Sequence, residues 1–341
     1  MAERGHRVSL IVADEHGDSW VEGVRILDVG RTDGRLGRIF HSTKQVYERA
    51  IAVDADVYIL HDPELIPYGL RLKRLGKKVV FDSHEDIPTQ VLGKPYLGHV
   101  QAFILSHSFR AYEKYACHRF SGVVAATPFI REKFIKINSK TIDINNYPIL
   151  KEFDHARPWR EKSLQVCYVG NIAPMRGIRE LIKACSLLQS PATLTLAGTF
   201  ETPALSAEVA LDKGWDRVEA LGHLDRTGVS EVMASSMAGL VTLHPQANYL
   251  DALPVKMFEY MAAGIPVIAS NFPVWREIIA GNACGICVDP LDPASISKAI
   301  DFLITHPAEA EKMGSNGRQA AINKYNWRCE SKKMLDFYDN L

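Results

Sequence analysis

The sequence predicts an α/β protein built from two doubly wound domains. Short apolar runs typical of buried strands alternate with helical stretches along the 341 residues, and this alternation is typical of parallel sheets with helices on both faces. The pattern occurs in two blocks, separated by a polar, proline-containing stretch without periodicity, YPILKEFDHARPWREKS (147–163). The chain is also long enough for two domains, predicted at 1–155 and 160–326.

In the first block, the opening residues MAERG are typical of a helix end with Gly5 as its C-cap. Because an α/β domain normally begins with a strand, we expect the first strand and most of the first helix of this domain to be missing. Helices are predicted over 38–52, 63–75 and 98–120. The strand candidates are VSLIVA (8–13), VRILDV (24–29), VYIL (57–60), KVVFD (78–82), GVVAAT (122–127) and TIDINN (141–146).

The second block repeats the rhythm. Its strand candidates are LQVCYVG (164–170), ATLTLAG (192–198), RVEALG (217–222), AGLVTLH (238–244), PVIAS (266–270) and GICVD (285–289). Helices are predicted over 176–189, 202–213, 227–235, 254–263, 273–280, 293–304 and 307–324.

The composition indicates an ordinary soluble protein of a reducing compartment. Lys plus Arg and Asp plus Glu both number 40, so net charge gives no indication of a nucleic-acid partner. The six cysteines are scattered, and we interpret the only close pair, Cys284-Gly-Ile-Cys287, as structural. This usage, with no signal peptide and no long apolar run, predicts a cytoplasmic location.

Titratable side chains follow two neighbouring strands of the first block. His61-Asp62 comes after 57–60, and His84-Glu85 comes after 78–82. Ligands of parallel sheets bind outside the carboxyl ends of the strands, so these residues are candidates for a functional rim. Helix capping by Asp62 remains the alternative for the first pair.

A second candidate site lies in the second block. The strand 164–170 ends in Gly170-Asn171, and Arg176-Gly177 stands at the entrance of the next helix; a glycine turn before a helix is typical of an anion site. Within DALPVKMFEYMAAGIPVIAS (251–270), Lys256 and Glu259 share one face of a helix. Their spacing is equally explained by an intrahelical ion pair on a solvated face. Dehydrogenase, P-loop and nucleophile-elbow signatures are absent from the sequence.

The helix predicted over 98–120 combines apolar side chains, such as Phe103 and Ile104, with basic ones, such as Arg110 and Lys114. We interpret it as an ordinary surface helix with an apolar underside. Docking on a membrane surface through a basic amphipathic face is the alternative.

Several motifs together resemble the family-4 retaining glycosyltransferases, also described as glycosyl transferases group 1. PVKMFEYMAAGIPVIAS with FPVWREII resembles the nucleotide-sugar motif, and CYVGNIAPMRGIRELIKAC resembles the opening of the donor domain. VVFDSHED resembles the segment with the active-site histidine, and KYNWRCESKKMLDFYDNL resembles the terminal helix that returns to the first domain. The resemblance spans most of the chain and implies a GT-B fold, with residues 327–341 as the crossover helix.

The family pattern implies roles for individual residues. Glu259 matches the acid that binds the donor ribose, and Asp251 stands where the family usually has the first Glu of the pair. Arg176 fills the second position of the basic pair that binds the diphosphate; the first falls on Asn171, and Lys256 is expected to supply that cation. Catalytic roles are implied for His84, Glu85 and Asp251. Donor-binding roles are implied for Gly170, Asn171, Arg176, Leu253, Pro254, Lys256 and Glu259.

The implied activity is retaining transfer of a sugar from a nucleoside-diphosphate donor, expected to be UDP-linked, to a sugar, polysaccharide or lipid-linked acceptor. No metal or cofactor is expected. Cell-surface polysaccharide biosynthesis, such as O-antigen or capsule, at the inner face of the membrane is the expected setting. Two alternatives stay open: a nucleotide-sugar-binding protein impaired in catalysis, and a sugar epimerase on the same fold.

Overall fold

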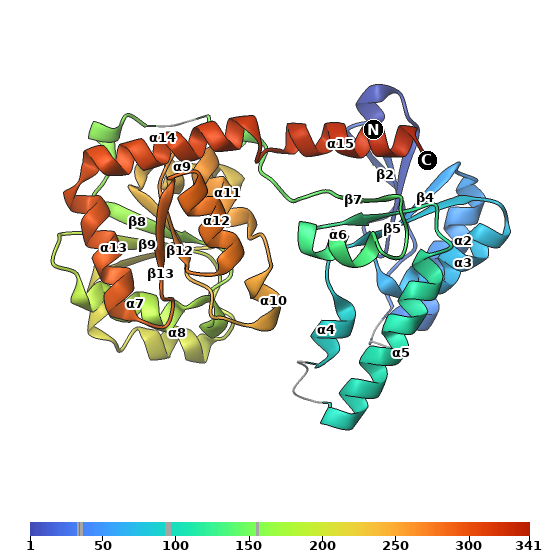
Figure 1. Ribbon diagram of the computed structural model, residues 1–341, viewed down its shortest axis with the longest axis horizontal. Helices are drawn as coiled ribbons and strands as arrows, with labels where there is room; N and C mark the ends of the chain where they lie inside the picture. Colours follow the sequence, from blue (N-terminus) through green and yellow to red (C-terminus); the bar gives the residue numbers. More distant parts are fainter. Residues whose placement is uncertain (33, 35–36, 93–96, 155–156) are drawn as a thin grey trace. The chain divides into compact units, whose positions relative to one another are not determined.

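The computed structural model describes residues 1–32, 34, 37–92, 97–154 and 157–341 (Figure 1). The chain divides into two compact units. The first consists of Met1–Ile144 and Lys332–Leu341, and the second of Asn145–Ser331. The first unit thus ends before the predicted boundary at 155–160, because Tyr147, Leu150 and Phe153 pack in the core of the second unit. Residues 155 and 156 of the predicted linker lie outside the described residues.

The second unit contains one six-stranded parallel sheet in the order β10-β9-β8-β11-β12-β13. Every strand was predicted within a few residues. The strands are β8 (Gln165–Val169), β9 (Thr193–Ala197), β10 (Val218–Gly222), β11 (Ala238–Val241), β12 (Val267–Ser270) and β13 (Gly285–Val288). The helices are α7 (Ile178–Leu187), α8 (Pro203–Val209), α9 (Arg226–Ser235), α10 (Ala247–Leu250), α11 (Val255–Ala262), α12 (Pro273–Gly281), α13 (Pro293–Thr305) and α14 (Pro307–Asn323).

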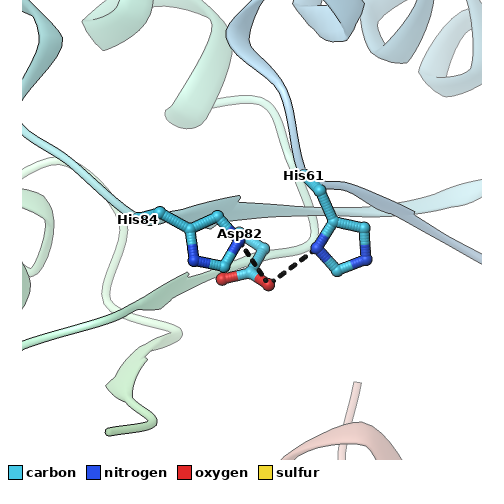
Figure 2. A group of neighbouring side chains, drawn as sticks. All are labelled: His61, Asp82 and His84. Carbon is cyan, nitrogen blue, oxygen red and sulfur yellow. Dashed lines mark hydrogen bonds and ion pairs between the residues drawn. The ribbon is translucent and has the colours of Figure 1, made fainter. Parts of the chain in front are cut away.

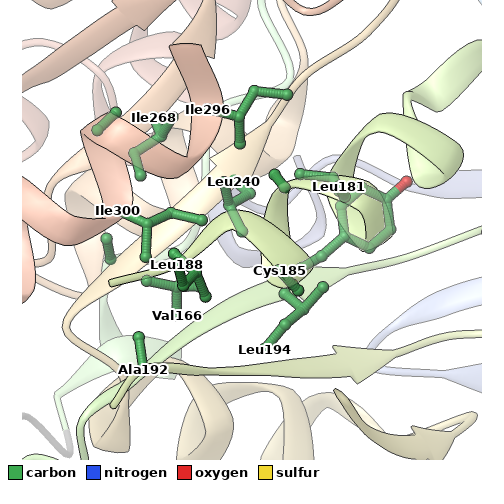
Figure 3. Close-up of a cluster of buried hydrophobic side chains, with 14 of the residues drawn as sticks. Val166, Leu181, Cys185, Leu188, Ala192, Leu194, Leu240, Ile268, Ile296 and Ile300 are labelled. Carbon is green, nitrogen blue, oxygen red and sulfur yellow. The ribbon is translucent and has the colours of Figure 1, made fainter. Parts of the chain in front are cut away.

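Helices cover both faces of this sheet, as the apolar strands predict. Successive strand residues point to opposite faces, so Val166 and Leu240 belong to one core cluster while Cys167 and Val241 belong to another. Figure 3 shows the first cluster, in which α7 and α13 pack on the sheet. The second cluster includes the fully buried Trp275 of α12. The sheet is therefore a rigid support for the loops at its carboxyl edge.

The first unit contains a four-stranded parallel sheet in the order β4-β5-β6-β7. Two of its helices, α4 and α6, were not predicted, since six or seven residues carry too little periodicity. The strands are β4 (Val57–Leu60), β5 (Lys78–Ser83), β6 (Gly122–Ala125) and β7 (Thr141–Asp143). The helices are α2 (Thr43–Val53), α3 (Ile66–Arg74), α4 (Ile87–Leu92), α5 (His99–Cys117) and α6 (Pro128–Phe134).

A second, three-stranded sheet of this unit has the order β1-β3-β2. Its strands β1 (Val8–Val12) and β3 (Val24–Asp28) are parallel as predicted, whereas β2 (Ser19–Val21) pairs antiparallel with β3 and was missed. Glu22 and Gly23, at φ 47° and 80°, make the two-residue turn of this hairpin. All three residues of β2 are exposed. The strand therefore has no buried face that would give its sequence an alternating apolar pattern.

The predicted terminal helix is α15 (Trp327–Asp339). Its last turns belong to the first unit, where Lys333 Nζ donates to Asp143 Oδ2 at 3.0 Å. Among the described residues, none of the helices combines the length and hydropathy that crossing a bilayer requires.

Candidate functional site

The loop after β8 brings together four of the predicted donor-binding residues, Gly170, Asn171, Arg176 and Lys256. Gly170 has φ 119°, a conformation that side chains rarely adopt. A Cβ at this position would lie 2.2 Å from Cε of Lys256. The absence of a side chain at Gly170 therefore lets the lysine of α11 lie directly over the loop.

Two cations meet at this loop. Lys256 Nζ lies 5.4 Å from the ring centroid of Tyr168, and Arg176 lies beside the same phenol, whose hydroxyl donates to the carbonyl of Asn171 at 2.8 Å. Burial, and then the nearby Arg176, lower the pKa of Lys256 to about 8. Neither cation forms an ion pair in the described part of the chain. Two half-buried cations without an anion make this loop a candidate anion site.

The start of α7 borders this candidate anion site. Gly177, at φ 78°, precedes the helix, and a Cβ on it would lie 2.2 Å from the carbonyl oxygen of Thr242. This close approach sets the first turn of α7 against the end of β11. The positive end of the helix dipole therefore lies next to Arg176 in the sequence and adds to the field of the cations.

Glu259 has a partner that its sequence neighbours do not reveal. Its carboxylate is 7% exposed and accepts from Nη1 of Arg226 at 2.8 Å, while Arg226 also contacts Glu152. The intrahelical ion pair with Lys256, considered from the spacing alone, is not formed. Lys256 and Glu259 thus share a helix face but have different surroundings, one over Gly170 and the other beside Arg226.

The segment between α10 and α11 holds the other predicted residues. Asp251 is half-buried at the end of α10, and Pro254 stands immediately before α11. Trp275 Nε1 donates to the carbonyl of Ala252 at 2.7 Å, and Leu253 packs against the core. The buried tryptophan therefore anchors the segment that carries Asp251.

His84 lies in a cluster of three side chains in the first unit (Figure 2). Its Nε2 lies 3.4 Å from Asp82 Oδ2, and Nδ1 of His61 lies 2.9 Å from the same oxygen. The two rings are stacked with centroids 5.9 Å apart. The hydrogen bond to Asp82 raises the pKa of His61. Glu85, by contrast, is exposed, and its carbonyl accepts from Ser83 Oγ at 3.2 Å.

The sequence interpretation missed Asp82, Tyr168 and Arg226. Asp82 appeared as the last residue of a strand, although its place between His61 and His84 follows from pairing the two strands side by side. Tyr168 belongs to an apolar strand sequence and was interpreted as a core residue; it is indeed 4% exposed. Arg226 carries no local signal, since its partner Glu259 is 33 residues away.

Each of the two units matches a known protein family. The family described as "Glycosyl transferases group 1" matches residues 151–320, and "Glycosyltransferase Family 4" matches residues 1–144. An alpha-maltose-1-phosphate synthase of Mycobacterium tuberculosis is 28% identical over 181 residues, which are 50% of this chain and 46% of that protein. The matched part thus spans less than half of that relative. The D-rhamnosyltransferase WbpZ of Pseudomonas aeruginosa is 26% identical over 288 residues, 79% of this chain and 69% of that protein.

Solved structures share the architecture. A sucrose-phosphate synthase from Thermosynechococcus elongatus has a TM-score of 0.76 at 20% identity, covering 99% of this chain and 90% of that one. Anabaena HepE in complex with UDP-glucose has a TM-score of 0.71 at 16% identity, covering 92% of this chain and 86% of that one. At such identities the likeness shows the fold alone. With both family matches, it follows that the chain belongs to family 4 of the glycosyltransferases and has the GT-B fold.

Proposed function

We propose that the protein is a retaining glycosyltransferase that moves a sugar from a UDP-linked donor to a polysaccharide or lipid-linked acceptor in cell-surface polysaccharide biosynthesis. The observation that carries the proposal is the meeting of two cations, Lys256 and Arg176, at the loop after β8, neither of which forms an ion pair with any residue that the structure describes. The UDP and UDP-glucose complexes of HepE support the choice of donor. The relatives named as an alpha-maltose-1-phosphate synthase and a D-rhamnosyltransferase support the choice of reaction.

The chemistry of transfer fits these residues. As the bond from the sugar to the diphosphate breaks, negative charge grows on the departing phosphate oxygens, and fixed cations stabilise it. Lys256, Arg176 and the start of α7 supply positive charge there, so the proposed reaction needs no metal. Glu259 is proposed to accept from the ribose hydroxyls, and Asp251 to contact the sugar. His84 is proposed to act near the reacting carbon.

A panel of nucleoside-diphosphate sugars, incubated with the full chain and candidate acceptors, tests the proposal. We expect release of nucleotide with one donor, unchanged after chelation of metals, and loss of release in Glu259→Ala. The proposal would be contradicted if the protein bound no nucleotide sugar and Glu259→Ala released nucleotide as the parent protein does. Donor binding without turnover favours the impaired binding protein, and a changed sugar formed without acceptor favours the epimerase.

We also propose that α5 contacts the membrane that holds a lipid-linked acceptor. Val100, Phe103 and Ile104 of this helix are 72%, 56% and 59% exposed, and Arg110 and Lys114 follow on the same helix. Such a combination of apolar and basic side chains binds at an anionic interface.

Cosedimentation with vesicles that contain anionic lipid tests this contact. Because a carboxylate resists transfer from water into the interface, Phe103→Asp with Ile104→Asp is expected to release the protein into the supernatant. Leu211→Asp provides the matched control, since Leu211 is 88% exposed in the second unit. Equal binding of both variants would contradict the contact.

A further inference from the structure

The cluster of His61, Asp82 and His84 has a property that sugar transfer does not require. Its three side chains come from the carboxyl ends of the neighbouring strands β4 and β5, and one nitrogen or oxygen of each lies within 4.8 Å of the others. We propose that this cluster binds a divalent transition-metal ion of the Zn²⁺ class. The proposal goes beyond the proposed function and does not rest on it; because the two share His84, the test of this proposal measures metal binding and not sugar transfer.

The spacing of the ligand atoms carries the proposal. Zn²⁺ binds imidazole nitrogen and carboxylate oxygen at about 2.0–2.2 Å in a tetrahedron, which places neighbouring ligand atoms about 3.3 Å apart. Asp82 Oδ2 lies 2.9 Å from His61 Nδ1 and 3.4 Å from His84 Nε2. The ligand nitrogens of the two imidazoles lie within 4.8 Å of each other, so binding an ion requires these two nitrogens to approach each other by at most about 1.5 Å.

The ligand set also suits this class of ion. Two imidazoles with one carboxylate favour Zn²⁺ and its transition-metal neighbours over Mg²⁺ or Ca²⁺, which prefer oxygen ligands. The carboxylate of Asp82 is 16% exposed, whereas His61 and His84 are 53% and 50% exposed. The site is thus anchored on its inner side and open on the other, where water can take the fourth position.

The backbone holds the ligands in place. Leu60 pairs with Phe81 in the parallel register of β4 and β5, so His61 and Asp82 directly follow a matched pair. Leu60 and Phe81 are 6% and 2% exposed. A buried pair of strands therefore fixes two of the ligands, and His84 stands two residues beyond Asp82. Such support lowers the ordering cost of binding.

Titration of the metal-stripped full chain with Zn²⁺, in competition with a chromophoric chelator, tests the proposal. We expect one ion per chain, and at least a tenfold loss of affinity in each of His61→Ala, His84→Ala and Asp82→Asn. His107→Ala is the matched control, because His107 is an exposed histidine whose Nδ1 lies 2.9 Å from the Phe103 carbonyl oxygen. All proteins carry Cys329→Ser, which removes the exposed thiol.

Titration with Co²⁺ gives a second readout, since its visible absorption reports nitrogen and oxygen ligands directly. Thermal unfolding without metal checks that each variant folds. No stoichiometric binding by the parent protein, or unchanged affinity in the double variant His61→Ala with His84→Ala, overturns the proposal. A spectrum lost in both histidine variants but retained in His107→Ala supports it.

Discussion

Replacing Lys256 by methionine is expected to weaken the binding of UDP by about 10- to 100-fold. A hydrogen bond to a charged group contributes about 1.5–3 kcal/mol, and each 1.4 kcal/mol is a factor of ten in affinity. Methionine keeps an unbranched stem over Gly170, where a Cβ would lie 2.2 Å from the lysine Cε, so the loop keeps its shape while the charge is lost. Titration calorimetry with UDP measures the change.

The same variant is expected to remove a pH dependence. The pKa of Lys256 is lowered to about 8 by burial and by Arg176, so in the free protein its charge is present below this pH and is lost above it. Affinity for UDP should therefore fall from about pH 7 to about pH 9, and this fall should be absent in Lys256→Met, which has no titrating group at that position. Lys183→Met, at an exposed position of α7, should behave like the parent. A methionine variant that binds as tightly as the parent would contradict the assignment.

Replacing Arg226 by leucine is expected to lower the free energy of unfolding by about 1–3 kcal/mol, the cost of leaving a buried hydrogen-bonding group without its partner. The arginine side chain itself is 57% exposed, so its charge is screened and contributes little alone. The cost arises at Glu259, whose carboxylate is 7% exposed and accepts from Arg226 at 2.8 Å. Urea unfolding measures the change.

A second substitution separates the buried carboxylate from other effects of the leucine. In Arg226→Leu with Glu259→Gln the buried charge is gone, and most of the lost stability should return. Arg179→Leu breaks a pair in which both side chains, at 48% and 52% exposed, meet water, and it should cost less than about 1 kcal/mol. Equal losses in Arg226→Leu and Arg179→Leu would show that burial of Glu259 has no energetic consequence.

Much of the fold was predictable, because periodicity survives wherever an element is long and one or both faces are buried. The central strands β8, β11 and β12 of the second unit are buried on both faces, and their sequences predict strands without reference to neighbours. By contrast β2 has three exposed residues, and α10 has four residues. Neither has a buried face long enough to impose a pattern.

The candidate site divides in the same way. Gly170, Arg176 and Lys256 were predicted from their places after a strand and on a helix, with the family resemblance, and the structure brings them to one loop. Asp82 was missed, because it meets His61 only when β4 and β5 pair side by side. Arg226 was missed, because it contacts Glu259, which is 33 residues away in the sequence.

Lys256 and Glu259 illustrate what can and cannot be predicted from the sequence. The sequence by itself determined that they share one face of a helix, because residues three apart on a 3.6-residue period must do so. Only the tertiary structure decided that Lys256 lies over Gly170 and that Glu259 pairs with Arg226. The physical reason is that charged side chains take their partners from whatever the packing of distant segments places within reach.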